Sequence, residues 1–313
     1  MDFLTFQDEL QKKIMEQSSE LDGEFQFEKV HKNNQVLHGV CYTPENSNAG
    51  MTFYAENMHK RYLNGESMDD IVQQFIMDVK EHEENMGFVQ DAAYNWVQKE
   101  NVVPALIGRK GNEEMLSGIP HVPFENLEII FKVPIPELHG TANVTYPMME
   151  SFGLTTEELL ETAKNNSVYK DAIQAVPMLE IMKELLGADA APKEEPQGPG
   201  SKMIVITNAD RYWGAAAILD KETMAAVSEK LGDDLYILPS SIHECIVVPK
   251  SDYEVSELKM MVQEINATQV ALPEILSDEV YMFDSYTLEM KMAQDTREKA
   301  KDVFVPRPVM GMI

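Results

Sequence analysis

The sequence predicts an α+β protein of two domains, and three observations support this prediction. The 313 residues exceed the usual size of one hydrophobic core. Hydrophobic residues make up 44% of the chain and charged residues 25%, which is typical of a folded globular protein. Helical patterns and hairpin patterns are mixed along the chain, which favours an α+β fold over a regular alternation of strands and helices.

A stretch without large apolar residues divides the chain. It lies within "GADAAPKEEPQGPGS", where Ala, Pro, Gly and charged residues cannot bury a core. We therefore expect an N-terminal α+β domain at 1–187, a linker at 188–200 and a C-terminal α+β domain with an apolar tail at 201–313. The tail, "VFVPRPVMGMI", contains two prolines that exclude a helix, and we expect it to dock in a surface groove.

Local patterns define the first domain. Apolar residues at spacings of three and four predict an opening helix, namely Phe3, Phe6, Leu10 and Ile14. The strands "FQFEKV" and "VLHGVCY" follow and are joined at Asn33 and Asn34. Ser67 and Asp70 resemble a capping box for a second helix, which we expect to end at Gly87. A third helix in "FVQDAAYNWVQ", strands in "VVPALIG" and "NLEIIFKVPI", and a capped helix in "TTEELLETAKNN" complete this domain.

The second domain shows the element order β-α-β-β-α-β, which is the order of a ferredoxin-like unit. Its strands are "MIVIT", "LYIL", "IHECIVV" and "VYMFDS". Asp220 caps the first helix and Gly232 ends it. Ser251 and Glu254 form a capping box for the second helix. The Pro-Ser-Ser turn between the middle strands favours a hairpin and leaves the order of strands in the sheet open.

The charge balance bears on partners. The chain has 26 Lys and Arg residues against 53 Asp and Glu residues, which gives a net charge of -27. It contains no Lys/Arg-rich run of the kind that binds along a phosphate backbone. Direct nucleic-acid binding is therefore disfavoured. Solubility explains such acidity most simply, and attraction to basic partners or mimicry of nucleic-acid charge are the alternatives.

The chain shows no sign of export or of a resident cofactor. The start, "MDFLTFQDEL", lacks the basic and apolar regions of a signal peptide, and no apolar run is long enough to span a membrane. We expect a cytoplasmic protein. Cys41 and Cys245 provide neither a disulfide framework nor a CxxC metal knuckle, and the 21 methionines are explained by core filling. We expect no metal and no cofactor.

The segment "ILPSSIHECIVVP", residues 237–249, contains most of the candidate catalytic residues. If 242–248 is a strand, His243 and Cys245 share one face while Glu244 lies on the other, so the histidine and the glutamate cannot hold one ion. A Cys–His pair is disfavoured because Cys245 has aliphatic and acidic neighbours. Ser240 and Ser241 are weak candidate nucleophiles, and turn formation is their simpler role.

A second group of candidates follows the strand "MIVIT". Asn208, Asp210 and Arg211 lie where loops often carry function, but "TNADRYWGAAA" lacks the glycine spacing that cradles phosphates. The alternative is a plain loop with Tyr212 and Trp213 at the surface.

The chain resembles an uncharacterised bacterial family, domain of unknown function 5688. The resemblance lies in "ITNADRYWGAAAIL", "YILPSSIHECIVVP" and "VQEINATQVALPEILSDEVYMFD", and it extends to "YLNGESMDDIV", "GIPHVPFENLEIIFKV" and "GLTTEELLETAKNNS". More distantly the chain resembles the YtpQ-like family. The resemblance implies a cytosolic protein that is an accessory factor of a mobile element, and it implies no substrate, cofactor or catalytic residue. In this family an aliphatic residue would be ordinary at Cys245, which further disfavours a thiol mechanism.

Three functional hypotheses follow. The first is a cytosolic, non-enzymatic binding or accessory protein with an unknown protein partner. The second is a hydrolase or transferase with a site at the 238–244 hairpin, with His243 as general base and Ser241, Glu244 or Asn208 assisting. The third is an acidic mimic of nucleic acid.

Overall fold

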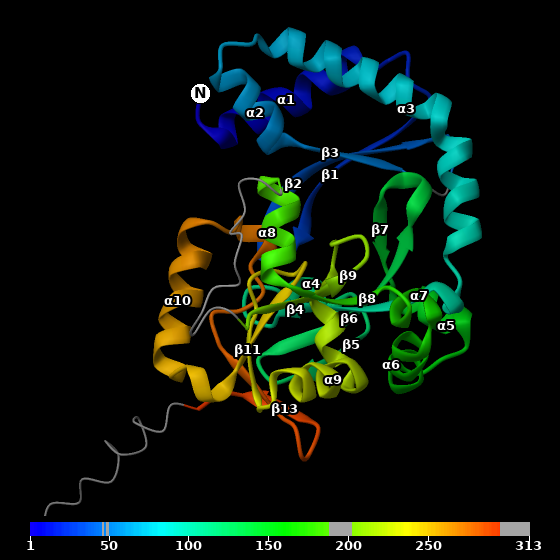
Figure 1. Ribbon diagram of the computed structural model, residues 1–313. Coiled ribbons are helices and arrows are strands. Elements are labelled where there is room, and N and C mark those ends of the chain that lie inside the picture. The colour runs from blue at the N-terminus through cyan, green and yellow to red at the C-terminus, as the bar shows by residue number, and fades with distance from the viewer. Residues whose placement is uncertain (46, 48–49, 188–201, 295–313) are drawn as a thin grey trace, which may run out of the picture. The chain divides into compact units, whose positions relative to one another are not determined.

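The computed structural model describes residues 1–45, 47, 50–187 and 202–294 and confirms the α+β class (Figure 1). The helices are α1 (Phe3–Gln17), α2 (Ala55–Leu63), α3 (Met68–Trp96), α4 (Glu113–Ser117), α5 (Tyr146–Phe152), α6 (Thr156–Asn165), α7 (Ser167–Lys170), α8 (Met178–Leu186), α9 (Lys221–Leu231) and α10 (Val255–Thr268). The strands are β1 (Gly23–Lys32), β2 (Gln35–Pro44), β3 (Met51–Tyr54), β4 (Val103–Gly108), β5 (His121–Phe124), β6 (Leu127–Ile135), β7 (Gly140–Asn143), β8 (Ile173–Pro177), β9 (Ile204–Asn208), β10 (Leu235–Leu238), β11 (Cys245–Pro249), β12 (Tyr281–Asp284) and β13 (Glu289–Met292). The expected linker and the apolar tail lie outside the described residues.

The contacts within the chain define two compact units, and neither is one continuous stretch of sequence. Unit 1 contains residues 1–104, 109–122 and 130–168, and unit 2 contains the intervening segments together with 169–313. Strand β8 precedes the expected linker yet pairs antiparallel with β9, which follows it. The division between the units therefore differs from the one expected at 188–200, because strand pairing joins residues on both sides of that segment.

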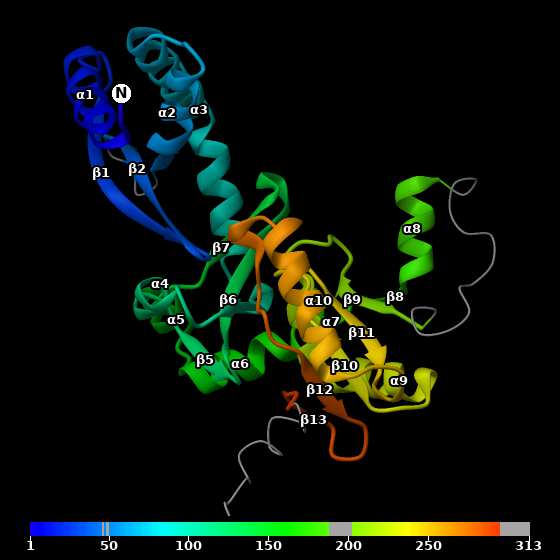
Figure 2. The ribbon, with the colours of Figure 1, turned by 90° about the vertical axis from the view of Figure 1, so that its left-hand side faces the viewer.

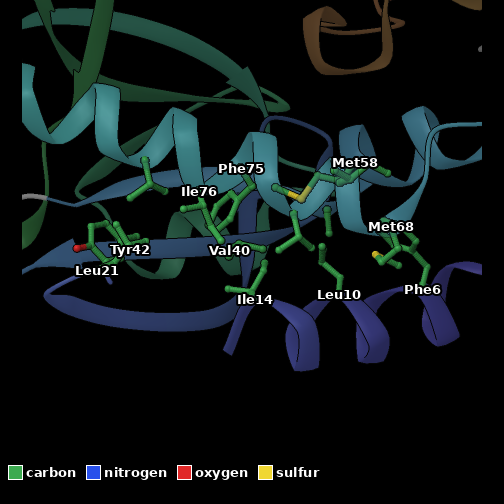
Figure 3. Close-up of a cluster of buried hydrophobic side chains, with 14 residues drawn as sticks. Phe6, Leu10, Ile14, Leu21, Val40, Tyr42, Met58, Met68, Phe75 and Ile76 are labelled. Carbon is green, nitrogen blue, oxygen red and sulfur yellow. The ribbon is translucent and has the colours of Figure 1, made fainter. Parts of the chain in front are cut away.

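The core of unit 1 forms between one sheet and three helices. The sheet order is β1-β2-β3, and the register places Phe25, Phe27, Val40, Tyr42 and Phe53 on one face. That face packs against α1, α2 and α3, and Figure 3 shows the side chains of α1 pointing toward Val40 and Phe75. The period-two alternation of β1 and β2 thus supplies one apolar face, as expected for a sheet with one solvated side.

Helix α3 is longer than predicted. The predicted capping residue is confirmed, since the Ser67 hydroxyl accepts from the Asp70 N–H at 3.1 Å. However, the helix does not end at Gly87 but continues to Trp96, so the two helices expected here are one. A single glycine costs about 1 kcal/mol relative to alanine inside a helix, which is too little to end it without a further stop signal.

Unit 2 contains a six-stranded sheet whose order is β13-β12-β10-β11-β9-β8. The four strands of the predicted β-α-β-β-α-β unit are present, but the second and third, β10 and β11, are central. A ferredoxin-like unit has its first and third strands central, so that order is not observed. Each crossover spans one intervening strand, as in a ferredoxin-like unit, but the fourth strand, β12, pairs with β10 and not with β9. Because β9 and β10 both run antiparallel to β11, they are parallel to each other and end at the same edge.

Both faces of this sheet are covered. Tyr236, Leu238 and Val248 pack against α10, which lies along the strands in Figure 2. The alternate residues, including Ile237 and Cys245, are buried on the opposite face, where the short helix η3 (Gly214–Leu219) lies next to β9. The central strands are therefore packed on both faces.

Two of the helix caps predicted for unit 2 are confirmed, and the prediction of a third is wrong. The Asp220 side chain accepts from the Thr223 N–H at 2.8 Å, and Gly232 adopts a left-handed conformation at the end of α9. The capping box predicted for Ser251 and Glu254 is not formed. Ser251 belongs to a 3-10 turn, so α10 begins three residues later than that box requires, with Glu254 in the N-cap position.

A buried lysine interrupts the apolar strand β6. Lys132 is 5% exposed, and its Nζ lies 2.7 Å from Asn143 Oδ1 on the paired strand β7. Burial lowers the pKa of Lys132 to about 7. A charged amine there is costly, so this position links the stability of unit 1 to pH.

The lowered pKa of Lys132 predicts that stability rises with pH. Because the pKa of Lys132 is lower in the folded chain, the unfolded chain binds more protons between about pH 7 and about pH 10. We expect the free energy of unfolding of the wild type, relative to Lys132→Met, to rise across this window by up to about 1.4 kcal/mol per pH unit. Urea unfolding at several pH values measures it. Lys29→Met, at an exposed lysine, is the control and should leave the pH dependence as in the wild type; a flat difference for Lys132→Met would contradict the linkage.

Candidate functional site

A strained loop of unit 2 follows strand β9. Within residues 208–214, Arg211 and Trp213 both have positive φ, at 50° and 58°. Such a conformation is uncommon for residues other than glycine, and it costs of order 1–3 kcal/mol at each such position. The surrounding structure must therefore hold this loop in place.

The Asn208 side chain closes the loop from within. Its Nδ2 donates to the Tyr212 carbonyl at 2.9 Å, and its Oδ1 accepts from the Tyr212 N–H at 3.1 Å.

The loop ends at Gly214, where there is no space for a side chain. A Cβ added at Gly214 would lie 2.5 Å from Thr207 Oγ1 and 2.7 Å from the His243 carbonyl oxygen. A glycine is required there because the backbones of two loops approach each other closely.

His243 also holds the loop, through its ring. The Trp213 N–H donates to Nδ1 of His243 at 3.2 Å, so in this arrangement the imidazole is neutral and carries its proton on Nε2. That nitrogen lies 3.8 Å from Glu274 Oε1. The Tyr212 ring stacks on the imidazole with the ring centroids 5.3 Å apart and the planes at 25°. We call these four residues the loop cluster: Tyr212, Trp213, His243 and Glu274.

Further hydrogen bonds fix the three segments of the loop cluster together. The Thr207 hydroxyl donates to the His243 carbonyl at 2.8 Å, and the Ala215 N–H donates to the Ile242 carbonyl at 3.2 Å. The Ile242 N–H donates to the Glu274 carbonyl at 2.8 Å. Glu274 belongs to the short helix η5 (Leu272–Glu274). These bonds join the end of β9 and the start of η3 to the bend at 242–243, and the bend to η5.

The backbone at His243 differs from the strand expected for 242–248. Strand β11 begins at Cys245, and residues 242–243 form a bend. The Ser240 hydroxyl donates to the Glu244 carbonyl at 3.1 Å, while the Ser241 hydroxyl accepts from the His243 N–H at 3.0 Å. These bonds turn the chain, so the alternation of faces does not apply to His243 and Glu244.

The structure brings some of the predicted site residues together and not others. Asn208 and His243 both hold the 212–213 segment by hydrogen bonds to its backbone. Ser240 and Ser241 bond to backbone groups of their own turn, and Glu244 contributes its carbonyl to both. Glu274 also belongs to the loop cluster, and it was not predicted from the sequence because no local motif marks it.

The structure also bears on a thiol mechanism, on metal binding and on a membrane span. Burial raises the pKa of the Cys245 thiol, which disfavours the reactive thiolate. Among the described residues, no group of three or more His, Cys, Asp and Glu side chains could hold a metal ion. Within the same part of the chain, no helix has the length and apolar character needed to cross a membrane.

The role of His243 as a loop anchor predicts a graded loss of stability. His243→Ala removes the acceptor of the Trp213 N–H, and we expect it to lower the free energy of unfolding by about 1–3 kcal/mol. His243→Gln offers an amide oxygen to the same donor and should lose less. Urea unfolding followed by circular dichroism measures both. Equal stability of the wild type and the alanine variant would show that the bond does not anchor the loop.

Comparison with known proteins places the chain in a family. No curated protein and no solved structure matches it significantly. The model of one family, described as "Family of unknown function (DUF5688)", matches residues 3–285, which include both the loop cluster and the core of unit 1. The more distant likeness to the YtpQ-like family stays an expectation. The chain therefore belongs to the DUF5688 family of unknown function.

Proposed function

We propose that this protein acts by binding a protein partner and that the Asn208–Gly214 loop is its recognition surface. One observation supports this most strongly. Arg211, Tyr212 and Trp213 are consecutive on a loop that Asn208 and His243 hold in a strained conformation. Arginine, tyrosine and tryptophan are the residue types most enriched among the energetic hot spots of protein interfaces.

The rigidity of the loop supports the same proposal. Binding costs conformational entropy when side chains and loops become ordered, and a loop already held in one conformation avoids part of that cost. Tyr212 is 45% exposed although its ring stacks on His243. Its exposed part is thus presented in a fixed orientation, and fixed loops on a rigid sheet often carry function.

The hydrolase or transferase alternative receives less support from the hydrogen bonds. A general base needs an unprotonated nitrogen within reach of a nucleophile. Nδ1 of His243 already accepts from Trp213, and the other ring nitrogen carries the proton in this arrangement. The hydroxyls of Ser240 and Ser241 bond within their own turn. Asn208 and His243 thus hold the 212–213 segment, and the two serines hold the 240–244 turn.

The acidic-mimic alternative predicts rows of carboxylates that are spaced like phosphates. Several carboxylates instead lie in ion pairs with basic residues, such as Glu20 with Lys80 and Asp234 with Lys250. This mixing of acidic and basic side chains favours the binding proposal over a mimic of nucleic acid.

The family resemblance suggests an accessory factor of a mobile element in the bacterial cytoplasm. A loop that recognises a protein partner would suit such a role.

Exchange of one exposed tyrosine tests the proposal. We expect Tyr212→Ala to reduce capture of a specific partner from a lysate of the native host by about tenfold or more, as for an interface hot spot. Tyr286→Ala is the matched control, because Tyr286 is 95% exposed elsewhere in unit 2. Quantitative mass spectrometry of the captured proteins measures the effect. If the wild type and both variants, all folded by circular dichroism, capture the same proteins equally, the loop is not the recognition surface.

A further inference from the structure

We infer that the loop cluster recognises a cationic side chain, a lysine or an arginine, on a basic protein partner. The inference rests on the proposed binding function and names the chemistry of the partner. The loop cluster combines the two groups that such a side chain needs. These are the exposed aromatic ring of Tyr212 and the carboxylate of Glu274, which both adjoin His243.

The aromatic part of the loop cluster has a suitable geometry. One face of the Tyr212 ring stacks on His243, and the Trp213 ring stands nearly perpendicular to it, with centroids 6.3 Å apart and planes at 78°. The quadrupole of an aromatic ring attracts a cation placed over its face within about 6 Å, most strongly for tryptophan and also for tyrosine. Two rings at nearly a right angle favour a cation that contacts both.

The carboxylate adds charge complementarity. The Glu274 side chain is 48% exposed, and its Oε1 lies 3.8 Å from Nε2 of His243, which is longer than a hydrogen bond. The carboxylate can therefore turn toward a bound ammonium or guanidinium group. Because the imidazole is neutral in this arrangement, it does not repel a cation beside it.

The other charges around the loop agree with a cationic ligand. The guanidinium of Arg211 pairs with Glu184 of α8, so its positive charge is balanced within the protein. The chain as a whole carries a net charge of -27, which attracts basic partners over a distance of about a Debye length, roughly 8–10 Å at moderate salt. Attraction at long range and recognition at the loop thus favour the same class of partner.

Nuclear magnetic resonance of the full chain tests this inference directly. The probe is N-acetyl-lysine amide, and the signal is the indole N–H of Trp213, which Trp213→Phe identifies. We expect saturable shifts with the lysine compound and none with the uncharged N-acetyl-norleucine amide at the same ionic strength. Tyr212→Ala and Glu274→Gln should each raise Kd about two- to fivefold. Tyr212→Phe, which keeps the ring, should bind as the wild type does. Glu264→Gln, at an exposed glutamate of α10, is the matched control.

Each outcome decides a separate question. Equal shifts with the lysine and norleucine compounds, no shift with either, or no effect of Glu274→Gln would overturn the cation inference. If the Tyr212→Ala variant nevertheless loses its captured partner, the binding function stands without it. Tighter binding of tetramethylammonium chloride than of the lysine compound would assign the site to a small quaternary ammonium ligand and would overturn the protein partner.

Discussion

The hydrogen bond from the Trp213 N–H to Nδ1 of His243 is the interaction on which the loop cluster depends. It spans 3.2 Å between residues that are 30 positions apart in the chain. It satisfies a donor in a strained segment, orients the imidazole against Tyr212 and directs Nε2 toward Glu274. Without it, the left-handed conformation at Trp213 would lose one of its supports, and the aromatic rings would no longer be held relative to the carboxylate.

The sheet of unit 2 is what makes this bond possible. The hairpin of β10 and β11 lies at the centre, and β9 pairs with β11, so β9 and β10 run parallel and end at one edge. The loops that follow them, 208–214 and 239–244, therefore start at the same edge of the sheet, on either side of β11. A ferredoxin-like order would keep β9, β11 and β10 as neighbours in this order and would change only the place of β12. The close approach of these loops also explains why residue 214 is a glycine, because the two backbones leave no space for a Cβ there.

Local rules predicted the local structure well, and the site required information that is not local. The cap at Asp220, the capped helix in "TTEELLETAKNN" and the period-two strands of unit 1 follow from neighbouring residues, so the sequence alone indicates them. The bend at His243 depends on serine hydroxyls that compete with the strand. Glu274 comes from a distant turn, and no spacing rule connects it to His243. The lysine in "IIFKVPI" was a visible signal, because a charge inside an apolar run indicates a buried polar position.

The position of the proton on the His243 ring tests directly whether Trp213 is anchored by this hydrogen bond. Long-range proton–nitrogen correlation spectra of the histidine rings, with His243 identified by His243→Gln, distinguish the two ring nitrogens. We expect that Nδ1 carries no proton and accepts a hydrogen bond, while Nε2 carries the proton. A proton on Nδ1, or a rapidly exchanging average of the two tautomers, would contradict the bond from Trp213 and with it the anchored loop.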